Sequence, residues 1–284
     1  MELKRFEDIN EFLEIAEPVL IENEVENNLI LGIVLYIQRD PTLYKERYLA
    51  ILQEGKQIKA ISVCTPPHKI LFLGKNKNCE NEIDLLVNDA VKSQLNTMGV
   101  LASPHHALQI AKKWQMKTGR TFKPGMSERI YKLNKVSFPK QPSGLMKLAE
   151  MTDLKLICKW MEEFREEAVP NDPLNDFTEF ATKKIENKDL VIWDDGKRAV
   201  ALASKARNTI NGTCINLVYT PKKFRRKGYA TALVANLSQR LLNDGWKFIA
   251  LFTDLSNQTS NRIYQKVGFK PVCDFQEYNF KAKD

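Results

Sequence analysis

Residues 218–231 read VYTPKKFRRKGYAT, and this stretch is the most informative part of the sequence. An apolar strand ends at Thr220, and a long amphipathic helix begins near Gly228, with a basic turn between them. The turn contains the spacing Arg225-x-x-Gly228-x-Ala230. A helix start presents unpaired backbone N–H groups and a partial positive charge, and small residues let an anion reach those groups. The stretch therefore predicts a strand–turn–helix unit that can hold a pyrophosphate.

The segments around this unit predict an α+β fold. Apolar periodicity predicts two helices, over residues 145–169 and 177–185, and the residues Asn171-Asp172-Pro173 end the first of them. Three strands joined by turn residues are predicted next, over 190–193, 199–206 and 213–219. They are followed by a helix over 227–243, a strand over 248–253, a helix over 256–267 and a strand over 272–280. An antiparallel meander thus switches to a strand–helix–strand unit. This order predicts a mixed, mostly antiparallel sheet flanked by helices.

The first half of the chain shows a fainter copy of the same order. Helices are predicted up to residue 38 and over 82–97 and 107–118, with strands over 48–52, 58–64, 70–73, 100–102 and 128–133. Residues 137–144 contain two prolines, a glycine and two serines, which is typical of an exposed connector. We therefore expect domains over 1–136 and 145–284, joined by a linker over 137–144. The corresponding turn of the first half, GKNKNC over 74–79, lacks the glycine-rich spacing, so the first domain is expected to be a degenerate copy.

Composition excludes several classes of protein. The chain has 284 residues, 43% of them hydrophobic and 27% charged, as in globular proteins. Its first residues lack the apolar core of a secretory signal, and no run reaches the roughly 20 apolar residues of a membrane span, so a cytoplasmic protein without a membrane partner is expected. Five scattered cysteines indicate reduced thiols, and the His105-His106 pair has no nearby cysteine or acidic ligand, so no metal site is predicted.

The net charge of +8 does not by itself indicate a nucleic-acid partner. From Leu145 onward there are 23 basic and 18 acidic residues, so the excess is mild and spread over both halves. A nucleic-acid module would also need base-stacking aromatic residues near the basic turn, where the sequence offers Phe224 and Tyr229. We expect a small polyanionic ligand at this turn and no nucleic acid.

A second motif makes a family resemblance specific. Residues 257–269 read NQTSNRIYQKVGF and match the pattern N-x-x-[SA]-x-x-x-Y-x-x-x-G-F. Together with Arg225-x-x-Gly228-x-Ala230, in this order and spacing, it resembles the GNAT superfamily of N-acetyltransferases over residues 145–284. The resemblance implies a GNAT-like α+β fold, with two such domains in tandem given the repeated order. It also implies acetyl-CoA as co-substrate, with no metal.

The resemblance assigns expected roles to particular residues. Tyr264 is expected to be the general acid that protonates the departing CoA thiolate. The strand edge is expected to bind the pantetheine arm of coenzyme A. The turn and the helix start are expected to bind the pyrophosphate, and two later asparagines are expected to form hydrogen bonds with the cofactor arm. In that order the expected cofactor-binding residues are Val218, Tyr219 and Thr220; Arg225, Arg226, Lys227, Gly228, Tyr229, Ala230 and Thr231; and Asn257 and Asn261.

The strand before the turn departs from the family pattern. Many relatives place a carboxylate there as general base, but residues 213–219 read TCINLVY. Either the base comes from elsewhere, such as Asp254, Glu277 or the first domain, or the amine arrives already neutral.

The favoured interpretation is acetyl transfer to a primary amine by direct attack in a ternary complex, with a small-molecule or peptide amine as acceptor. Transfer to an amino acid such as glycine is an alternative within enzymes. A non-catalytic CoA sensor or scaffold is the alternative outside enzymes, and the sequence leaves the oligomeric state open, a dimer included.

Overall fold

The computed structural model describes residues 1–168 and 176–281, which form two compact units. Unit 1 contains Met1–Ile130, Asp254–Ser256 and the segment from Val272 onward, and unit 2 contains Tyr131–Thr253 and Asn257–Pro271. This division differs from the expected domain ranges, because the chain enters unit 2 before the expected linker and its end returns to unit 1. The expected break at Asn171-Asp172-Pro173 lies outside the described residues.

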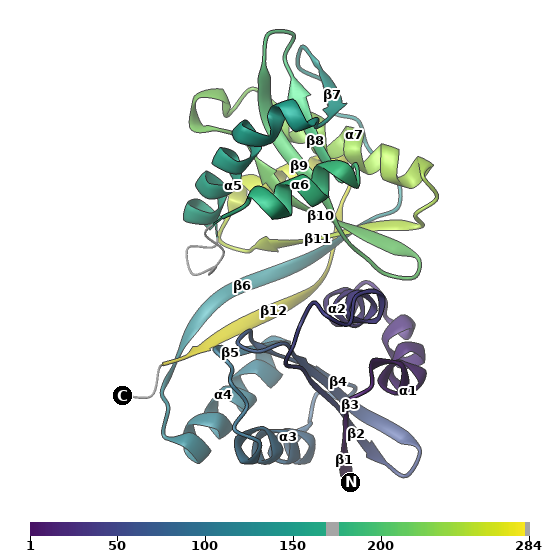
Figure 1. The fold of residues 1–284 in the computed structure, drawn as a ribbon, viewed down its shortest axis with the longest axis vertical. Helices are drawn as coiled ribbons and strands as arrows, with labels where there is room; N and C mark the ends of the chain where they lie inside the picture. The colour runs from purple at the N-terminus through teal and green to yellow at the C-terminus, as the bar shows by residue number, and fades with distance from the viewer. Residues whose placement is uncertain (169–175, 282–284) are drawn as a thin grey trace. The chain divides into compact units, whose positions relative to one another are not determined.

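Both halves of the chain have the same order of elements, β-α-α-β-β-β-α-β-α-β (Figure 1). The first half contains β1 (Glu2–Phe6), α1 (Ile9–Glu22), α2 (Asn28–Arg39), β2 (Tyr48–Glu54), β3 (Gln57–Cys64), β4 (Ile70–Gly74), α3 (Glu80–Lys92), β5 (Gly99–Ala102), α4 (Pro104–Thr118) and β6 (Phe122–Leu133). The second half contains β7 (Leu145–Leu148), α5 (Leu154–Ala168), α6 (Thr178–Glu186), β8 (Leu190–Asp194), β9 (Ala199–Asn208), β10 (Gly212–Tyr219), α7 (Tyr229–Asn243), β11 (Phe248–Asp254), α8 (Gln258–Val267) and β12 (Lys270–Phe280). The predicted fold class is confirmed.

The strand order shows where the last strand of the chain belongs. In unit 1 the order is β1-β2-β3-β4-β5-β12-β6, and in unit 2 it is β6-β11-β10-β9-β8-β7. Strand β12 runs antiparallel to β5, with Gln276 opposite Ala102 and Asn279 opposite Gly99. Within unit 1, a bidentate ion pair between Arg129 and Asp274 (2.6 and 2.8 Å) also holds β12.

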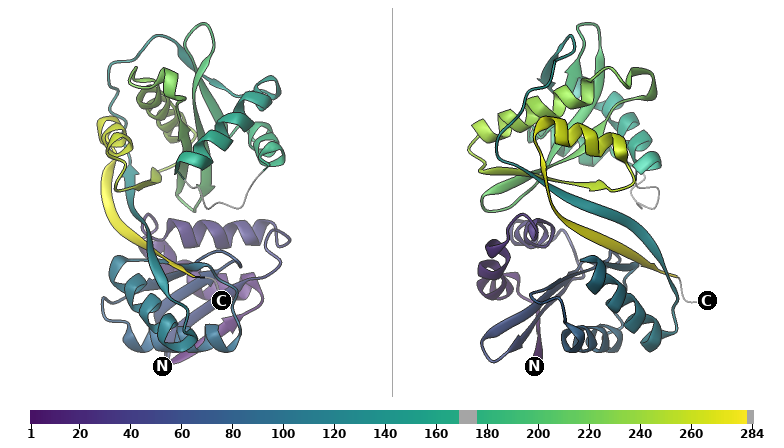
Figure 2. Two further views of the ribbon diagram at one scale, coloured as in Figure 1. Left: turned by 90° about the vertical axis from the view of Figure 1, so that its left-hand side faces the viewer. Right: turned by 180° about the vertical axis from the view of Figure 1, so that it is seen from behind.

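Two helix pairs cover the two faces of the unit 2 sheet, as Figure 2 shows from further sides. Along β8, Leu190 and Ile192 belong to the core cluster under α5 and α6, whereas Val191 and Trp193 belong to the cluster under α7 and α8. This alternation follows from the two-residue period of a strand. The unit 2 sheet therefore has two faces, one covered by α5 and α6 and the other by α7 and α8.

The start of the second half differs from the prediction. A helix was expected from residue 145, but residues 145–148 form β7, which pairs antiparallel with β8, and a 3₁₀ turn over Met151–Asp153 (η1) precedes α5. The helical spacing of the first apolar residues is misleading, because Leu145 and Met151 are 54% and 51% exposed.

The expected connector over 137–144 has no regular structure, but it is attached to unit 2. The Trp193 indole N–H donates to the Ser143 carbonyl (3.0 Å), and the Asn236 amide donates to Gln141 Oε1 (3.1 Å). The segment therefore belongs to the packed structure of unit 2.

Several classes of feature are not found in the described residues. No helix within 1–168 or 176–281 combines the length and apolar character needed to cross a membrane. The same residues contain no group of three or more histidine, cysteine or acidic side chains placed to hold a metal ion. All five cysteines are free thiols.

Candidate active site

Strands β10 and β11 part along their length in unit 2. Their described pairing is parallel and covers three positions, from Gly212 opposite Phe248 to Cys214 opposite Ala250. Strand β10 then continues to Tyr219 with an irregular register against β9, and Leu217 adopts a left-handed φ of 50°. Since a leucine rarely adopts this conformation, the bulge is a strained feature that redirects the strand. The backbone edge of β10 that faces β11 is thereby left without a strand partner beyond Cys214.

The predicted strand-edge residues lie on this diverging segment. Val218 packs toward the core under α7, whereas Tyr219 is 5% exposed and packs with α5 and α6. Thr220 follows directly, and its carbonyl accepts a hydrogen bond from Arg225 Nε (2.8 Å). The three residues therefore form the end of β10 where it enters the basic turn.

The basic turn leads to an open helix start. Gly228 is the N-cap of α7 with a left-handed φ of 86°, and the nearest atom that an added Cβ would meet is Pro142 Cδ at 3.9 Å. The first turn of α7 carries no acidic residue, and no side chain caps it. Arg226 and Lys227 are exposed beside it, Tyr229 is buried in the core, and Ala230 and Thr231 are half-buried in the first turn. Free N–H groups, a glycine and cations together suit an anion such as a pyrophosphate.

Within the described part of the chain, Arg225 is already paired, unlike Arg226 and Lys227. Its terminal nitrogen lies 2.6 Å from Glu167 Oε2 on α5, and its Nε is bound to the Thr220 carbonyl. Lys222 lies 3.9 Å from the same carboxylate. Arg225 thus fastens the turn to α5, which leaves Arg226, Lys227 and the backbone amides for an anion.

The asparagines of the later motif hold the start of α8. Asn257 is the N-cap, and its side-chain oxygen accepts the Ser260 N–H (3.0 Å). The Asn261 amide donates to the Asn257 carbonyl (2.8 Å), and its oxygen accepts from the Tyr131 hydroxyl (3.0 Å). Both residues have structural hydrogen bonds, so a role toward a cofactor arm stays a prediction.

Tyr264 lies on α8 within the core cluster of unit 2. It is 7% exposed and packs edge-on against Phe269, with the Tyr131 ring 6.3 Å away. Burial raises the pKa of the Tyr264 phenol to about 12, and a hydrogen bond with Ser260 partly opposes this shift. The phenol is therefore protonated throughout the physiological range and is chemically able to donate a proton.

The expected sources of a general base are engaged in structural contacts. Asp254 accepts from the N–H and hydroxyl of Ser256 (2.8 and 2.7 Å). Glu277 belongs to unit 1, where it accepts the Met126 N–H (3.1 Å) and pairs with Lys69 (2.9 Å).

Helix α5 brings a different carboxylate to the end of β10. The Tyr219 hydroxyl donates to Glu163 Oε2 at 2.7 Å, and Lys159 lies 4.0 Å from the other oxygen. Burial and the Glu163 carboxylate raise the pKa of Tyr219, so the phenol stays the donor and Glu163 the acceptor. Sequence reasoning missed Glu163, because nothing in the local pattern of an amphipathic helix shows which strand end its acidic residues will meet.

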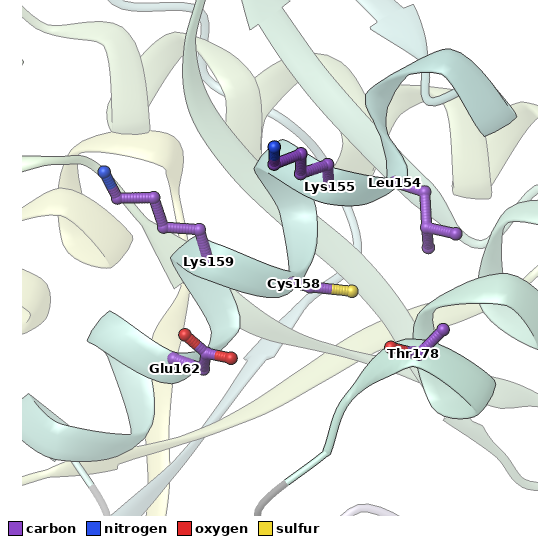
Figure 3. Close-up of a pocket in the computed structure, with 6 residues that line it drawn as sticks. All are labelled: Leu154, Lys155, Cys158, Lys159, Glu162 and Thr178. Atoms are coloured by element: carbon purple, nitrogen blue, oxygen red, sulfur yellow. The ribbon is translucent and has the colours of Figure 1, made fainter.

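A surface hollow of about 400 Å³ lies elsewhere, between α5 and α6. In Figure 3 the Cys158 sulfur points across it toward Thr178, while Lys155 and Lys159 extend away. Burial raises the pKa of the Cys158 thiol, which is thus a poor nucleophile at neutral pH. The hollow contains no residue of the basic turn, so we assign it no part in the site.

Sequence comparisons give one match. A family model described as "FR47-like protein" matches residues 196–278, a range that includes both motifs. A search of curated protein sequences found no significant match.

Solved structures resemble the whole chain. An acetyltransferase of the GNAT family from Colwellia psychrerythraea superimposes with a TM-score of 0.60 at 13% identity, covering 99% of this chain and 100% of its own. A Drosophila protein gives a TM-score of 0.70 at 12% identity, with 98% of each chain covered. A tandem GNAT protein from the clavulanic acid biosynthesis pathway gives 0.56 at 12% identity, covering 100% of this chain and 99% of its own. The predicted resemblance to GNAT proteins is confirmed for the fold, which is shared over the full length of the chain.

Proposed function

We propose that this chain is an acyl-CoA-dependent N-acyltransferase that moves an acetyl group from acetyl-CoA to a primary amine. The observation that carries the proposal is the parted pair of β10 and β11, which ends at the open, cation-rich start of α7. Where two strands separate, the backbone N–H and C=O groups of one strand edge are free to bind an extended amide chain. A helix start with a glycine N-cap offers N–H groups to phosphates. Acetyl-CoA has both parts in one molecule.

The residues present fit acetyl-CoA as co-substrate. Residues 226–231 would hold the pyrophosphate, and the edge of β10 at Val218 and Tyr219 would bind the pantetheine arm. Backbone N–H groups at this edge would also stabilise the negative charge that develops on the thioester oxygen. The bound co-substrate supplies the activated acyl group.

Two side chains complete the proton balance of direct attack. As the C–N bond forms, the amine loses a proton, which Glu163 accepts at the end of β10, directly or through a water molecule. As the C–S bond breaks, the departing sulfur gains a proton from Tyr264. Glu163 is a carboxylate that can accept a proton, and Tyr264 is a phenol that stays protonated and so has a proton to donate.

Two measurements test the activity. Acetyl-CoA at 100 times its dissociation constant should stabilise the folded chain by about 2.7 kcal/mol, which a thermal melt detects. A CoA-release assay over amines, amino acids, polyamines and aminoglycosides should then find at least one acceptor. No thermal shift in the folded protein would exclude acetyl-CoA, whereas binding without release for any acceptor would favour a CoA sensor or scaffold.

Exchange of Glu163 tests the assigned base. Glu163→Gln should lower kcat on the order of 10²-fold while leaving the affinity for acetyl-CoA within about twofold, because it removes a proton acceptor but keeps the side chain's shape. Glu166→Gln, an exposed residue of the same helix, is the matched control and should keep parent kinetics. Equal kcat in the parent and Glu163→Gln would remove Glu163 from the mechanism.

A further inference from the structure

Arg207 and the nearby Lys184 and Lys205 form a group of basic side chains in unit 2, and Arg207 lies on the α5–α6 face of the sheet. On β11, Ile249 and Leu251 belong to the core under α7, so the alternating residue Phe252 faces the opposite side. The guanidinium carbon of Arg207, on β9, lies 5.5 Å from the centre of the Phe252 ring. Phe252 comes two residues after the last paired position of β11. Arg207 is therefore placed where β10 and β11 part, on the same face as Tyr219 and its partner Glu163.

The charges of this group are unbalanced. Lys184 and Lys205 share one carboxylate, Asp189, at 3.2 and 3.4 Å, and these three side chains are 13–25% exposed. Burial lowers the pKa of Lys184, and repulsion from Lys205 and Arg207 adds to this effect. Within the part of the chain that the structure describes, no carboxylate lies within 4 Å of Arg207. Three cations thus face one anion.

Arg207 also lacks a hydrogen-bond partner where one is expected. Among residues 1–168 and 176–281, its buried Nε finds no acceptor, and its side-chain partner is the Cys214 thiol, which is a weak acceptor. The face of Phe252 attracts the positive charge but accepts no strong hydrogen bond from Nε. Arginine at such a half-buried position is normally paired with a carboxylate or phosphate, whose planar or forked oxygens match its donors.

We propose that Arg207 binds a carboxylate of the acyl acceptor, so that the substrate class is an amine that also carries a carboxylate. Lys184 and Lys205 add positive potential around it. This proposal rests on the proposed function, because it places the acceptor between Arg207 and the end of β10. The acceptor's carboxylate then lies toward Arg207 on β9, and its amine lies toward the parted strands.

A binding experiment tests the carboxylate site without relying on turnover. The probes are N-acetyl amino acids and their uncharged N-acetyl amino acid amides, titrated into the full chain by calorimetry. The parent should bind at least one N-acetyl amino acid at least tenfold more tightly than its amide. Arg207→Gln should abolish this preference, and Arg207→Lys should weaken it about three- to tenfold because a lysine cannot form the bidentate contact. Arg198→Gln, an exposed arginine on the β8–β9 hairpin, should keep it.

Turnover gives the second readout. With free amino acids and their amides as acceptors, Arg207→Gln should raise the KM of the amino acids at least tenfold, change that of the amides less than twofold, and leave the affinity for acetyl-CoA unaltered. A parent that binds N-acetyl amino acids and their amides equally, or an Arg207→Gln variant that keeps the preference, overturns the carboxylate site. A parent that discriminates in binding but releases no CoA with any acceptor refutes the proposed function and leaves the site supported. If Arg207→Gln does not fold, the Arg207→Lys binding ratio decides.

Discussion

The two halves of the chain have the same order of strands and helices, but they differ at the turn after the third strand of each meander. In the second half, Gly228 is the N-cap of a helix whose first turn carries no acidic residue. In the first half, a Cβ on Gly74 would lie 2.5 Å from Cys79 Sγ and 2.9 Å from the ring of His106. The His106 Nε2 is bonded to the carbonyls of Asn76 and Lys77 at 2.9 and 3.1 Å. One turn is open, and the other is filled by its own side chains.

The strands that follow the next helix in each half, β5 and β11, differ in the same way. Strand β5 ends at Ala102, which is still paired with Phe72 of β4, whereas β11 continues four residues beyond its last pairing with β10. In addition, Glu80 and Glu82 occupy the first turn of α3, where they complement the helix dipole themselves. The two copies of the repeated fold thus differ at this position, because one leaves the helix start open and the other fills it with packed side chains.

The largest effect is expected at Gly228. Gly228→Glu should weaken acetyl-CoA binding at least 100-fold, because it places a carboxylate where phosphate oxygens must approach the helix start. Gly196→Glu is a matched control, since Gly196 also has a left-handed φ (96°) and open surroundings. Calorimetry should show one site per chain in the parent and in Gly196→Glu, and none in Gly228→Glu. Two sites per chain in the parent would contradict the contrast between the halves, because the first half would then bind as well.

A smaller effect is expected at Tyr264. Tyr264→Phe should lower kcat by about 10²-fold, the low end for a general acid, because a thiolate is already a fair leaving group. Acetyl-CoA affinity should stay within about twofold. An unchanged kcat together with a melting temperature several degrees lower would show that the hydroxyl has a structural role alone.

The raised pKa of Tyr264 also predicts the pH dependence. Its folded pKa of about 12 lies above the unfolded value of about 10, so its contribution to stability is complete below pH 10 and is lost as the pH rises from 10 toward 12. Activity that depends on the protonated phenol should therefore show no alkaline decline from this group below pH 10. The fall in melting temperature above pH 10 should be shallower in Tyr264→Phe than in the parent.

The smallest effect is expected in the closed turn of the first half. His106→Gln should lower the free energy of unfolding by about 1–2 kcal/mol, through loss of hydrogen bonds to the turn, and leave acetyl-CoA affinity and kcat unchanged. The exposed neighbour His105→Gln is the control. A marked loss of acetyl-CoA affinity in His106→Gln would show that this turn contributes to acetyl-CoA binding and does not serve packing alone.

Burial lowers the pKa of His106, although the two carbonyl contacts oppose this shift. Below about pH 6.5 the unfolded chain therefore takes up a proton that the folded chain resists, and stability falls as the pH falls. The acid-side decrease in melting temperature should be smaller in His106→Gln than in the parent.

Local patterns were sufficient for most elements. The Asp-Gly and Asn-Gly turns marked the β8–β9–β10 meander, and the spacing Arg225-x-x-Gly228-x-Ala230 marked an open helix start, because turn type and helix capping depend on residues close in sequence. The short strands β1 and β7 were missed. Leu145 and Leu148 of β7 are exposed, so the spacing of these apolar residues does not indicate which side of the segment is buried.

The sequence by itself determined the repeated α+β order, the candidate phosphate-binding turn and the position of Tyr264 on a helix, since each depends on short-range periodicity or spacing. Three further features became visible in the folded chain alone: β12 joins unit 1, Glu163 meets the Tyr219 hydroxyl, and Arg207 lies on Phe252. These contacts join residues 45 or more positions apart in the chain. Such contacts depend on strand neighbours and on packing over the sheet, and neither leaves a local pattern in the sequence.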